Sequence, residues 1–298
     1  MYIDSVLEAI GRTPLLRLGR MSPYEVLAKL EMLNPGGSIK DRVARHLIEE
    51  AERSGRLGPG SVIVEASSGN TGIGMVLVGV QKGYRVIIVM PGNMSEERKK
   101  IIRALGGELM LTPPEESLEG ALKKVYELRD SDPRVWVPQQ FENPGNPEIH
   151  YRETAAEIWE QTAGRVDAFV AGVGSGGTLQ GVGKFLKERN RGALVVAVEP
   201  KNSSALLGQE PGLHQIQGIG DGFIPDVLDV SMVDEVVEVS DEDAIETTRK
   251  LSRDLGLLVG ISSGANVWAA RRLAERILGN ITTVLPDRAE RYFSTALM

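Results

Sequence analysis

A regular alternation of short apolar runs with helical patterns is the feature that most limits the fold of this chain. From Val62 onward, runs rich in valine and isoleucine are each followed by a segment with the apolar spacing of a helix. Such alternation is typical of parallel sheets covered by helices on both faces. The expected strands are 62–64, 86–89, 108–111, 135–137, 168–170, 194–198, 236–239, 257–259 and 282–285, with an earlier pair at 14–18 and 26–30. The expected helices are 39–51, 72–82, 95–105, 118–129, 149–162, 178–188, 241–255 and 265–278.

The length of the chain and one segment rich in proline and glycine indicate two domains. At 298 residues the chain is long for a single hydrophobic core, and residues 143–147 (Asn-Pro-Gly-Asn-Pro) offer the best crossing point. We therefore expect an α/β protein with two domains, each a mostly parallel twisted sheet with helices on both faces. The smaller, mobile domain is expected to span residues 35–145, and the larger domain residues 1–34 plus 146–298.

Composition excludes several classes of protein. The net charge of −7 argues against nucleic acid as the main partner, because phosphate binding needs a basic face. The most apolar window, 73–80, is far shorter than the roughly 20 residues of a membrane helix. The chain has no cysteine, which excludes disulfides and thiolate catalysis and fits a cytoplasmic protein. The histidines are isolated, so we expect surface or hydrogen-bonding residues rather than a metal site at His46, His150 and His214.

Lys40 occupies an unusual place, the first turn of an expected helix. Ser38 followed by Asp41 predicts an N-cap with a weak capping box, after a turn at residues 35–37 (Pro-Gly-Gly). A cation is disfavoured there, since a helix N-terminus carries roughly half a positive charge. One interpretation is a lysine that bends into solvent. The other is an amine kept partly neutral, as a Schiff-base lysine must be to attack a carbonyl.

Two glycine-rich loops each connect an expected strand to an expected helix, where ligands of such folds gather. Residues 67–72 (Ser-Ser-Gly-Asn-Thr-Gly) suit a carboxylate or a phosphate, or else form a tight turn with N-capping serines. Asn70 adds an amide for a phenolic or carbonyl oxygen. Residues 172–178 (Gly-Val-Gly-Ser-Gly-Gly-Thr) contain four glycines, which cost chain entropy, and they predict a phosphate-binding cup.

The second loop also matches a dinucleotide-binding pattern. Gly172, Gly174 and Gly177 form G-x-G-x-x-G, and Glu199 ends the next strand about 22 residues later, where a ribose-binding acid is expected. An NAD-dependent dehydrogenase is therefore a competing interpretation. It leaves Lys40 and the loop at 67–72 unexplained.

A third loop, residues 260–264 (Gly-Ile-Ser-Ser-Gly), fits the nucleophile-elbow pattern of an α/β-hydrolase. That fold needs a histidine after the serine and the acid, and no histidine follows His214. Ser262 therefore lacks a downstream base. A serine at a helix start can instead offer its hydroxyl to a ring nitrogen, or simply cap the helix.

Together these features suit pyridoxal 5'-phosphate with an amino-acid substrate. The motifs at 34–42 (Asn-Pro-Gly-Gly-Ser-Ile-Lys-Asp-Arg), 67–72, 174–178 and 260–264 resemble those of the cysteine synthase and cystathionine β-synthase family. Further matches occur at 11–15, 139–144, 217–220 and 290–292, so the resemblance covers nearly the whole chain in order. It implies fold type II of the pyridoxal-phosphate enzymes, the fold of the tryptophan synthase β-subunit.

The resemblance also implies roles for single residues. Lys40 would hold the cofactor as a Schiff base and move the α-proton, and Asn70 would contact the ring oxygen beside the imine. Ser262 would meet the pyridine nitrogen. The cofactor phosphate would bind Gly174, Ser175, Gly176, Gly177 and Thr178. The substrate carboxylate would bind Ser67, Ser68, Gly69, Thr71 and Gln140, in the smaller domain.

The implied reaction is β-replacement, in which O-acetylserine and sulfide (or another thiol) give L-cysteine and acetate. Cystathionine β-synthase and O-phosphoserine sulfhydrylase are alternative activities within the family. A catalytically silent member of the family that serves as a binding partner is a further alternative. The resemblance further implies a homodimer and a serine acetyltransferase C-terminal peptide as a partner, with no nucleic acid and no membrane.

Three positions depart from the family pattern. Ser67 stands where threonine is more common, which keeps the hydroxyl. Asp221 stands where sulfhydrylases usually have a small neutral residue. A carboxylate there would repel O-phosphoserine, contact the amine of homocysteine, or simply be solvated. Asp287 is the third departure, and the sequence offers no physical account of it.

Overall fold

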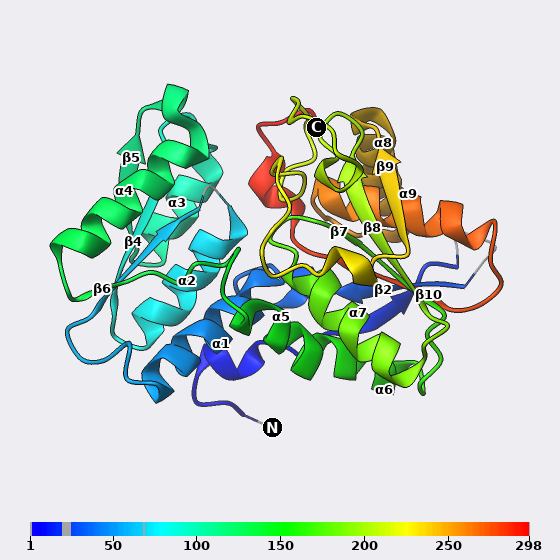
Figure 1. The fold of residues 1–298 in the computed structure, drawn as a ribbon, viewed down its shortest axis with the longest axis horizontal. Helices are drawn as coiled ribbons and strands as arrows, with labels where there is room; N and C mark the ends of the chain where they lie inside the picture. Colours follow the sequence, from blue (N-terminus) through cyan, green and yellow to red (C-terminus); the bar gives the residue numbers. More distant parts are fainter. Residues whose placement is uncertain (1, 20–24, 68, 298) are drawn as a thin grey trace. The chain divides into compact units, whose positions relative to one another are not determined.

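The computed structural model describes residues 2–19, 25–67 and 69–297, and it divides into two compact units. Unit 1 comprises Met1–Ile10 and Asn34–Gly145, and unit 2 comprises Gly11–Leu33 and Asn146–Met298. Residues 2–10 thus pack with unit 1, whereas residues 11–19 and 25–33 pack with unit 2. Figure 1 shows the elements of both units, and each unit is described separately below.

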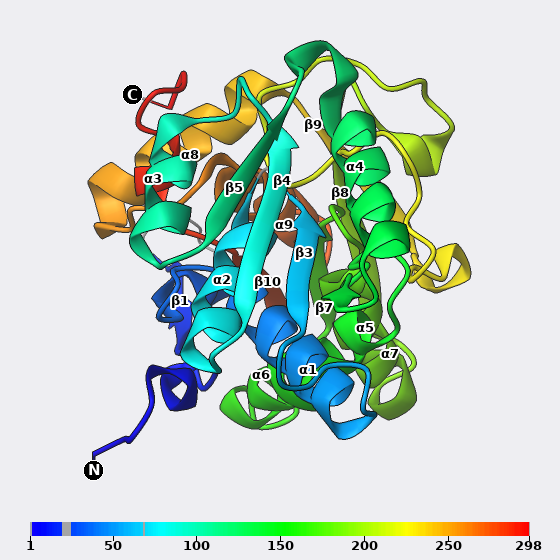
Figure 2. The ribbon, with the colours of Figure 1, turned by 90° about the vertical axis from the view of Figure 1, so that its left-hand side faces the viewer.

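Unit 1 contains a four-stranded parallel sheet with helices on both faces (Figure 2). The strand order is β5 (Glu108–Thr112), β4 (Arg85–Pro91), β3 (Val62–Ala66) and β6 (Val135–Trp136). Helix α4 (Ser117–Ser131) packs Ala121 and Val125 against Val62, Val64 and Val89. The other helices are α1 (Lys40–Arg53), α2 (Asn70–Gln81) and α3 (Glu96–Ala104), with 3-10 turns at Val6–Ala9 and Pro114–Glu116.

Unit 2 contains a six-stranded sheet that is parallel except at one edge. Its order is β1 (Leu15–Arg17), β2 (Val26–Leu30), β10 (Ile281–Leu285), β7 (Ala168–Gly172), β8 (Leu194–Pro200) and β9 (Glu235–Val239). Only the β1–β2 pair among these is antiparallel. The helices are α5 (Gly145–Ile149), a π-helical segment (His150–Ala155), α6 (Ala156–Gln161), α7 (Gly177–Arg189), α8 (Asp241–Leu255) and α9 (Ile261–Ala274).

The side chains of the central strand β7 are buried on both faces of this sheet. Successive side chains of a strand point to opposite faces. Ala168 and Val170 belong to the core formed with α8 and α9, whereas Phe169 and Ala171 belong to the core formed with α7. A strand buried on both sides must be apolar throughout, as this one is. The predicted fold class, a mostly parallel α/β arrangement, is therefore confirmed.

The expected elements form, with one exception among the strands. Residues 14–18 and 26–30 yield the β1–β2 pair, which joins the sheet of unit 2 beside β10. The strand expected at 257–259 is wrong, since Val259 makes only an isolated bridge to Arg288. Gly256 ends α8 in the left-handed conformation and Gly260 precedes α9, so three residues merely link two helices.

Two expected helices differ in their detail. The helix expected at 149–162 begins earlier, at Gly145, and carries a π-helical segment in its middle. The helix expected at 265–278 begins instead at Ile261, so the loop motif itself forms its first turn. Within the part of the chain that the structure describes, no helix has both the length and the apolar character that crossing a bilayer requires.

Candidate active site

Lys40 is the first residue of helix α1, as the sequence predicts, but the cap differs in detail. The N-cap position is Ile39, and its side chain makes no capping hydrogen bond. The Ser38 hydroxyl accepts from the Lys40 backbone N–H at 3.3 Å. The Asp41 carboxylate accepts from the backbone N–H of Gly36 at 2.6 Å and so stabilises the preceding turn. The expected capping box centred on Ser38 is therefore wrong, although both polar side chains bond to this turn.

Lys40 lies where α1 crosses α2 closely. A Cβ atom on Gly74 of α2 would lie 2.9 Å from the backbone oxygen of Lys40, so only glycine allows this approach. The lysine is half-buried, and its positive charge acts on the Glu65 carboxyl at the end of β3. Lys40 is therefore held where α1 packs against α2 and acts on a buried carboxyl, unlike a lysine that bends freely into solvent.

The loop at 67–72 is organised by one serine. The buried Ser67 hydroxyl accepts from the backbone N–H groups of Gly69 and Gly72, at 3.2 and 3.1 Å. Gly69 is the N-cap of α2 and has no side chain to cap it, and the Ser67 hydroxyl bonds instead to the third N–H of the helix. The positive end of the helix dipole at this turn favours an anion. Asn70 is the first residue of the helix. Ser68, which the sequence assigns to the same carboxylate site, lies outside the described residues.

Gln140 and Thr71 are brought together, as expected of two residues that bind one carboxylate. They are 69 positions apart in the chain, and the Thr71 hydroxyl donates to Gln140 Oε1 at 2.7 Å. Both side chains are buried. Gln140 Nε2 in turn lies 3.5 Å from Glu65 Oε1, at the long limit of a hydrogen bond.

Glu65 is a residue that the motifs did not single out. Its side chain is 3% exposed at the end of β3. Burial raises the pKa of its carboxyl from 4.5 to about 8, although the Lys40 charge acts in the opposite direction. A single acidic residue inside the apolar run Val62–Ala66 was the available signal, since carboxylates are seldom buried without a reason.

Glu65→Gln is expected to make the stability of the protein less dependent on pH. The pKa of about 8 exceeds the ordinary value of 4.5, so the folded carboxyl keeps a proton that the unfolded chain loses. The resulting stabilisation is complete below pH 4.5 and is lost as pH rises through 8. The wild-type free energy of unfolding should therefore fall by about 2–4 kcal/mol more than that of the variant across this window. Denaturant unfolding at a series of pH values measures it, and parallel curves would contradict the shift.

In unit 2, the loop at 172–178 carries the chain from β7 into α7. Gly176 is the N-cap of α7, with φ of 76° and no capping side chain, so the first N–H groups of this helix are open to an anion. A Cβ atom on Gly174 would collide with the carbonyl oxygen of Gly218, and one on Gly177 would collide with the side chain of Asn146. The glycines are thus required by close approach as well as by conformation.

Two side chains outside the motif support its hydroxyl groups. Asn146 Nδ2 donates to the Ser175 hydroxyl at 3.0 Å, and Asn146 is fully buried. His150 Nε2 lies 3.3 Å from the Thr178 hydroxyl, while its Nδ1 pairs with the hydroxyl of Thr154 at 3.0 Å. Sequence analysis missed Asn146 and His150 as supports, because neither belongs to a motif and both lie about 30 positions away.

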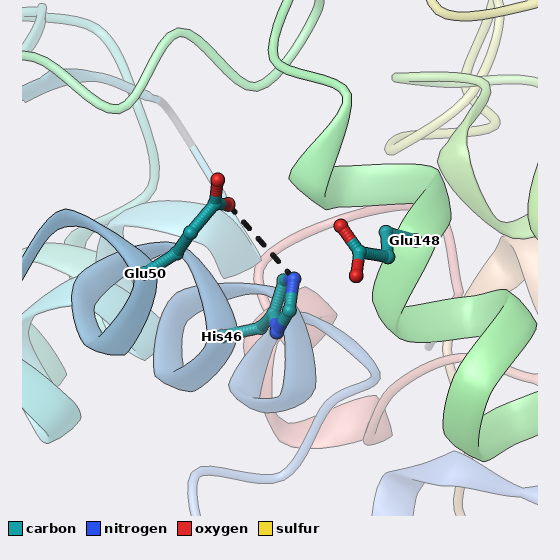
Figure 3. Close-up of side chains that lie close together, drawn as sticks. All are labelled: His46, Glu50 and Glu148. Atoms are coloured by element: carbon teal, nitrogen blue, oxygen red, sulfur yellow. Dashed lines mark ion pairs between the residues drawn. The ribbon is translucent and has the colours of Figure 1, made fainter. Parts of the chain in front are cut away.

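The other two histidines also have partners. His46 and Glu50 lie on successive turns of α1, with Nε2 and Oε2 4.0 Å apart (Figure 3). His214 Nε2 lies 3.0 Å from the carbonyl oxygen of Gly220. His150 and His214 thus take part in hydrogen bonds, as the sequence led us to expect, and His46 lies beside a carboxylate. His46 and His150 are buried and are therefore not surface residues.

Ser262 lies in the first turn of α9, where it is 4% exposed. Gly260 is the N-cap there and provides no capping side chain. Helix α9 is also connected to the loop at 172–178, since Asn266 accepts from the backbone N–H of Gly172 at 2.8 Å. Ser262 and the loop at 172–178 are therefore carried by directly connected elements of unit 2.

Asp287, for which the sequence offered no account, packs against the same turn. Its carboxylate accepts from the Tyr292 hydroxyl, and its backbone oxygen accepts from the N–H of Gly260 at 3.1 Å. A Cβ atom on Gly260 would collide with both side chains. Asp287 is fully buried and thus helps to hold the start of α9.

Glu199, the acidic residue on which the dinucleotide interpretation depends, is bonded within its own turn. The Glu199 carboxylate accepts from the Ser204 hydroxyl at 2.7 Å and from the backbone N–H of Leu206 at 3.1 Å. Burial raises its pKa. This side chain therefore stabilises the turn after β8 instead of presenting itself to a ribose.

Each unit taken by itself carries groups that fit a part of pyridoxal phosphate. The uncapped start of α7, with the glycine backbone and the hydroxyls of Ser175 and Thr178, is the donor set that a phosphate requires. Ser262 offers a buried neutral hydroxyl of the kind that can meet a pyridine nitrogen. Lys40 supplies a primary amine in the other unit.

Comparison with known proteins gives one consistent answer. A family model described as pyridoxal-phosphate dependent enzyme matches residues 6–287. A cysteine synthase of Staphylococcus aureus is 46% identical, with 99% of this chain and 97% of that protein covered.

Solved structures agree with this. A cysteine synthase of Entamoeba histolytica superposes with a TM-score of 0.95 at 41% identity, over 100% of this chain and 91% of that one. An O-acetylserine dependent cystathionine β-synthase of Helicobacter pylori superposes with 0.94 at 42% identity, over 100% and 99%. This chain belongs to the family of pyridoxal-phosphate dependent enzymes that contains the cysteine synthases.

Proposed function

We propose that this enzyme makes L-cysteine from O-acetylserine and sulfide. The bond between the β-carbon and the ester oxygen breaks, and its electron pair leaves on acetate. The sulfur of sulfide then forms the new bond at the β-carbon. The main support is the similarity to cysteine synthase along the whole chain. The start of α7 without a side-chain cap and the hydrogen bond between Thr71 and Gln140 are compatible with the sites that the proposal needs.

When bound, pyridoxal phosphate supplies an aldehyde for a Schiff base and a conjugated ring that withdraws electrons from the α-carbon. Lys40 would hold the cofactor through its amine and would move the α-proton. Residues 174–178 would hold the phosphate, and Asn70 would bind the ring oxygen. The neutral Ser262 hydroxyl would leave the ring nitrogen with little positive charge, which would favour loss of the β-substituent over transamination.

The substrate carboxylate is assigned to the domain of residues 35–145, and the cofactor phosphate to the domain of residues 1–34 plus 146–298. The backbone N–H groups at the start of α2 and the amide of Gln140 are the donors for the carboxylate. The residues assigned to this site are Ser67, Ser68, Gly69, Thr71 and Gln140. Homodimer formation, a cytoplasmic location and the docking of an acetyltransferase peptide are predictions from the resemblance.

Steady-state assays test the proposal directly. O-acetylserine, O-phosphoserine and serine are each supplied with sulfide and with homocysteine, and O-acetylserine with sulfide is expected to give the highest kcat/KM. The purified enzyme is also expected to absorb visible light, because a Schiff base of pyridoxal phosphate is yellow. A colourless protein without β-replacement activity would refute the proposal.

Cystathionine synthesis is the second candidate, favoured by the similarity to the Helicobacter pylori enzyme. In that case homocysteine replaces sulfide as the nucleophile, and the same acetate leaves. The assay with O-acetylserine and homocysteine distinguishes the two activities.

Asp221→Ala is expected to change the ranking of the substrates. Asp221 is exposed between Gly220 and Gly222, both of which have positive φ. Removing its charge should raise kcat/KM for O-phosphoserine if the carboxylate repels phosphate, or lower it for homocysteine if the carboxylate contacts the amine. An exposed charge contributes about 0.2–1 kcal/mol, so the change should be up to about fivefold. Asp226→Ala, an exposed aspartate nearby, is the control. An unaltered ranking would mean that the Asp221 carboxylate does not act on the substrate.

A further inference from the structure

Glu65, Gln140 and Thr71 form a buried chain of polar side chains in unit 1. Their exposed fractions are 3%, 7% and 4%. Thr71 donates to Gln140 Oε1 at 2.7 Å, and Gln140 Nε2 lies 3.5 Å from Glu65 Oε1. Thr71 and Gln140 have roles in the proposed function, whereas Glu65 has none. A carboxyl is costly to bury, so its place at this position needs a reason.

We propose that Glu65 is a positioning residue for the substrate carboxylate, because it orients the side-chain amide of Gln140. This inference rests on the proposed function, in which Gln140 binds that carboxylate. Glu65 does not touch the substrate and acts through Gln140 alone.

The chemistry of a primary amide explains why an orienting partner is needed. The Gln140 side chain has one oxygen and two N–H donors, and a half-turn about its last bond exchanges them. Thr71 donates to the oxygen, and Glu65 accepts from the nitrogen, so both ends of the amide are fixed. The second N–H then stays available for a carboxylate. The reversed amide would present its oxygen and repel that anion.

The charge state of Glu65 matters because it lies beside a site for an anion. The charge that acts on its carboxyl in the protein without cofactor is that of Lys40 of α1, and it lowers the pKa. In the holoenzyme the proposed function gives that amine to the cofactor. Helix α2, which packs against β3, has no charged residue between Asn70 and Gln81. The charged side chains of α4 are not buried, and Arg85 of β4 is exposed and paired with Glu108 at 2.7 Å. An ionised Glu65 would therefore repel the substrate carboxylate with little to compensate it.

The first test compares the wild type and Glu65→Gln across pH. Glutamine keeps an acceptor oxygen for Gln140 but cannot ionise. With a carboxyl pKa of about 8, the ionised fraction rises from about a tenth at pH 7 to about nine tenths at pH 9. The KM for O-acetylserine should rise about tenfold more in the wild type than in Glu65→Gln over this range. The kcat values should change alike in both proteins.

The second test measures binding without turnover. L-alanine has the α-carboxylate but no leaving group, and L-alaninamide lacks the carboxylate charge. Calorimetry on the holoenzyme should show the Kd for L-alanine rising about tenfold more in the wild type than in Glu65→Gln between pH 7 and 9. The Kd for L-alaninamide should show no such difference. Glu65→Leu, which removes the acceptor, should weaken L-alanine binding about tenfold already at pH 7.

Glu199 provides a matched control for Glu65. Glu199→Gln makes the same substitution at a buried strand residue of unit 2 and should leave the alkaline loss of L-alanine binding in place. Equal pH profiles for wild type and Glu65→Gln, or equal effects on L-alanine and L-alaninamide, would overturn the proposal. Failure of the proposed function would look different, as an enzyme that binds L-alanine with this pH dependence yet does not convert O-acetylserine and sulfide.

Discussion

Lys40→Ala is expected to remove both the visible absorbance of the purified enzyme and its turnover. Lys40, the first residue of α1, supplies the amine that the proposed Schiff base requires. Alanine can neither form that bond nor move the α-proton. Proton transfer by a positioned group alone contributes about 10²–10⁴-fold, so kcat/KM should fall by at least about 10³-fold. Absorbance spectra and assays of O-acetylserine with sulfide measure the two effects.

The control for this result is Lys82→Ala. Lys82 also lies in unit 1, where it is half-buried and pairs with Glu52 at 2.8 Å, but it belongs to no motif. This variant should keep its absorbance and its activity. Borohydride reduction followed by peptide mass spectrometry should place the cofactor on Lys40 in the wild type. An adduct on another lysine, or sulfide-dependent activity in Lys40→Ala, would refute the assignment.

Gly174→Ala is expected to weaken cofactor binding by at least about 100-fold. The new methyl group would collide with the carbonyl oxygen of Gly218, so one of the two loops must move. Movement of the phosphate loop misaligns several charge-assisted hydrogen bonds, each of which contributes about 1.5–3 kcal/mol. Equilibrium dialysis against pyridoxal phosphate measures the affinity. Overpacking should also lower the free energy of unfolding by about 1–3 kcal/mol.

Gly192→Ala provides the matched comparison. Gly192 lies in the same unit just beyond α7, and a Cβ atom there would come no closer than 3.5 Å to Asn190. Its cofactor affinity should equal that of the wild type. If Gly174→Ala bound the cofactor equally well, the phosphate would have to be held elsewhere.

The agreement between sequence and structure is closest where local physics decides the outcome. The apolar spacing of α8 predicts its bounds, Asp241–Leu255, without error, because a serine cap and a left-handed glycine frame it. The strands of unit 2 were predictable because burial on both faces makes them uniformly apolar. The strand expected at 257–259 does not form because these three residues only link the end of α8 to the start of α9. The apolar pattern of so short a run cannot distinguish a strand from such a link.

The parts of the site that were missed depend on contacts distant in sequence. Asn146 supports Ser175 from 29 positions away, and Glu65 lies beside Gln140 across 75 positions. No spacing rule connects such pairs, so only the folded chain shows them together. The motif residues were easier to find because each loop contains several of them within a few positions.

The long connection between β8 and β9 suggests how such an enzyme changes its substrates over evolutionary time. Residues 201–234 contain two 3-10 turns and several exposed apolar side chains, and Asp221 lies among them. Substitutions at exposed positions away from special contacts usually change stability by less than about 0.5 kcal/mol. Substitutions at exposed positions of this connection can therefore change which substrates the enzyme accepts. The strands β8 and β9 that it joins need not change, so the stability of the fold is kept.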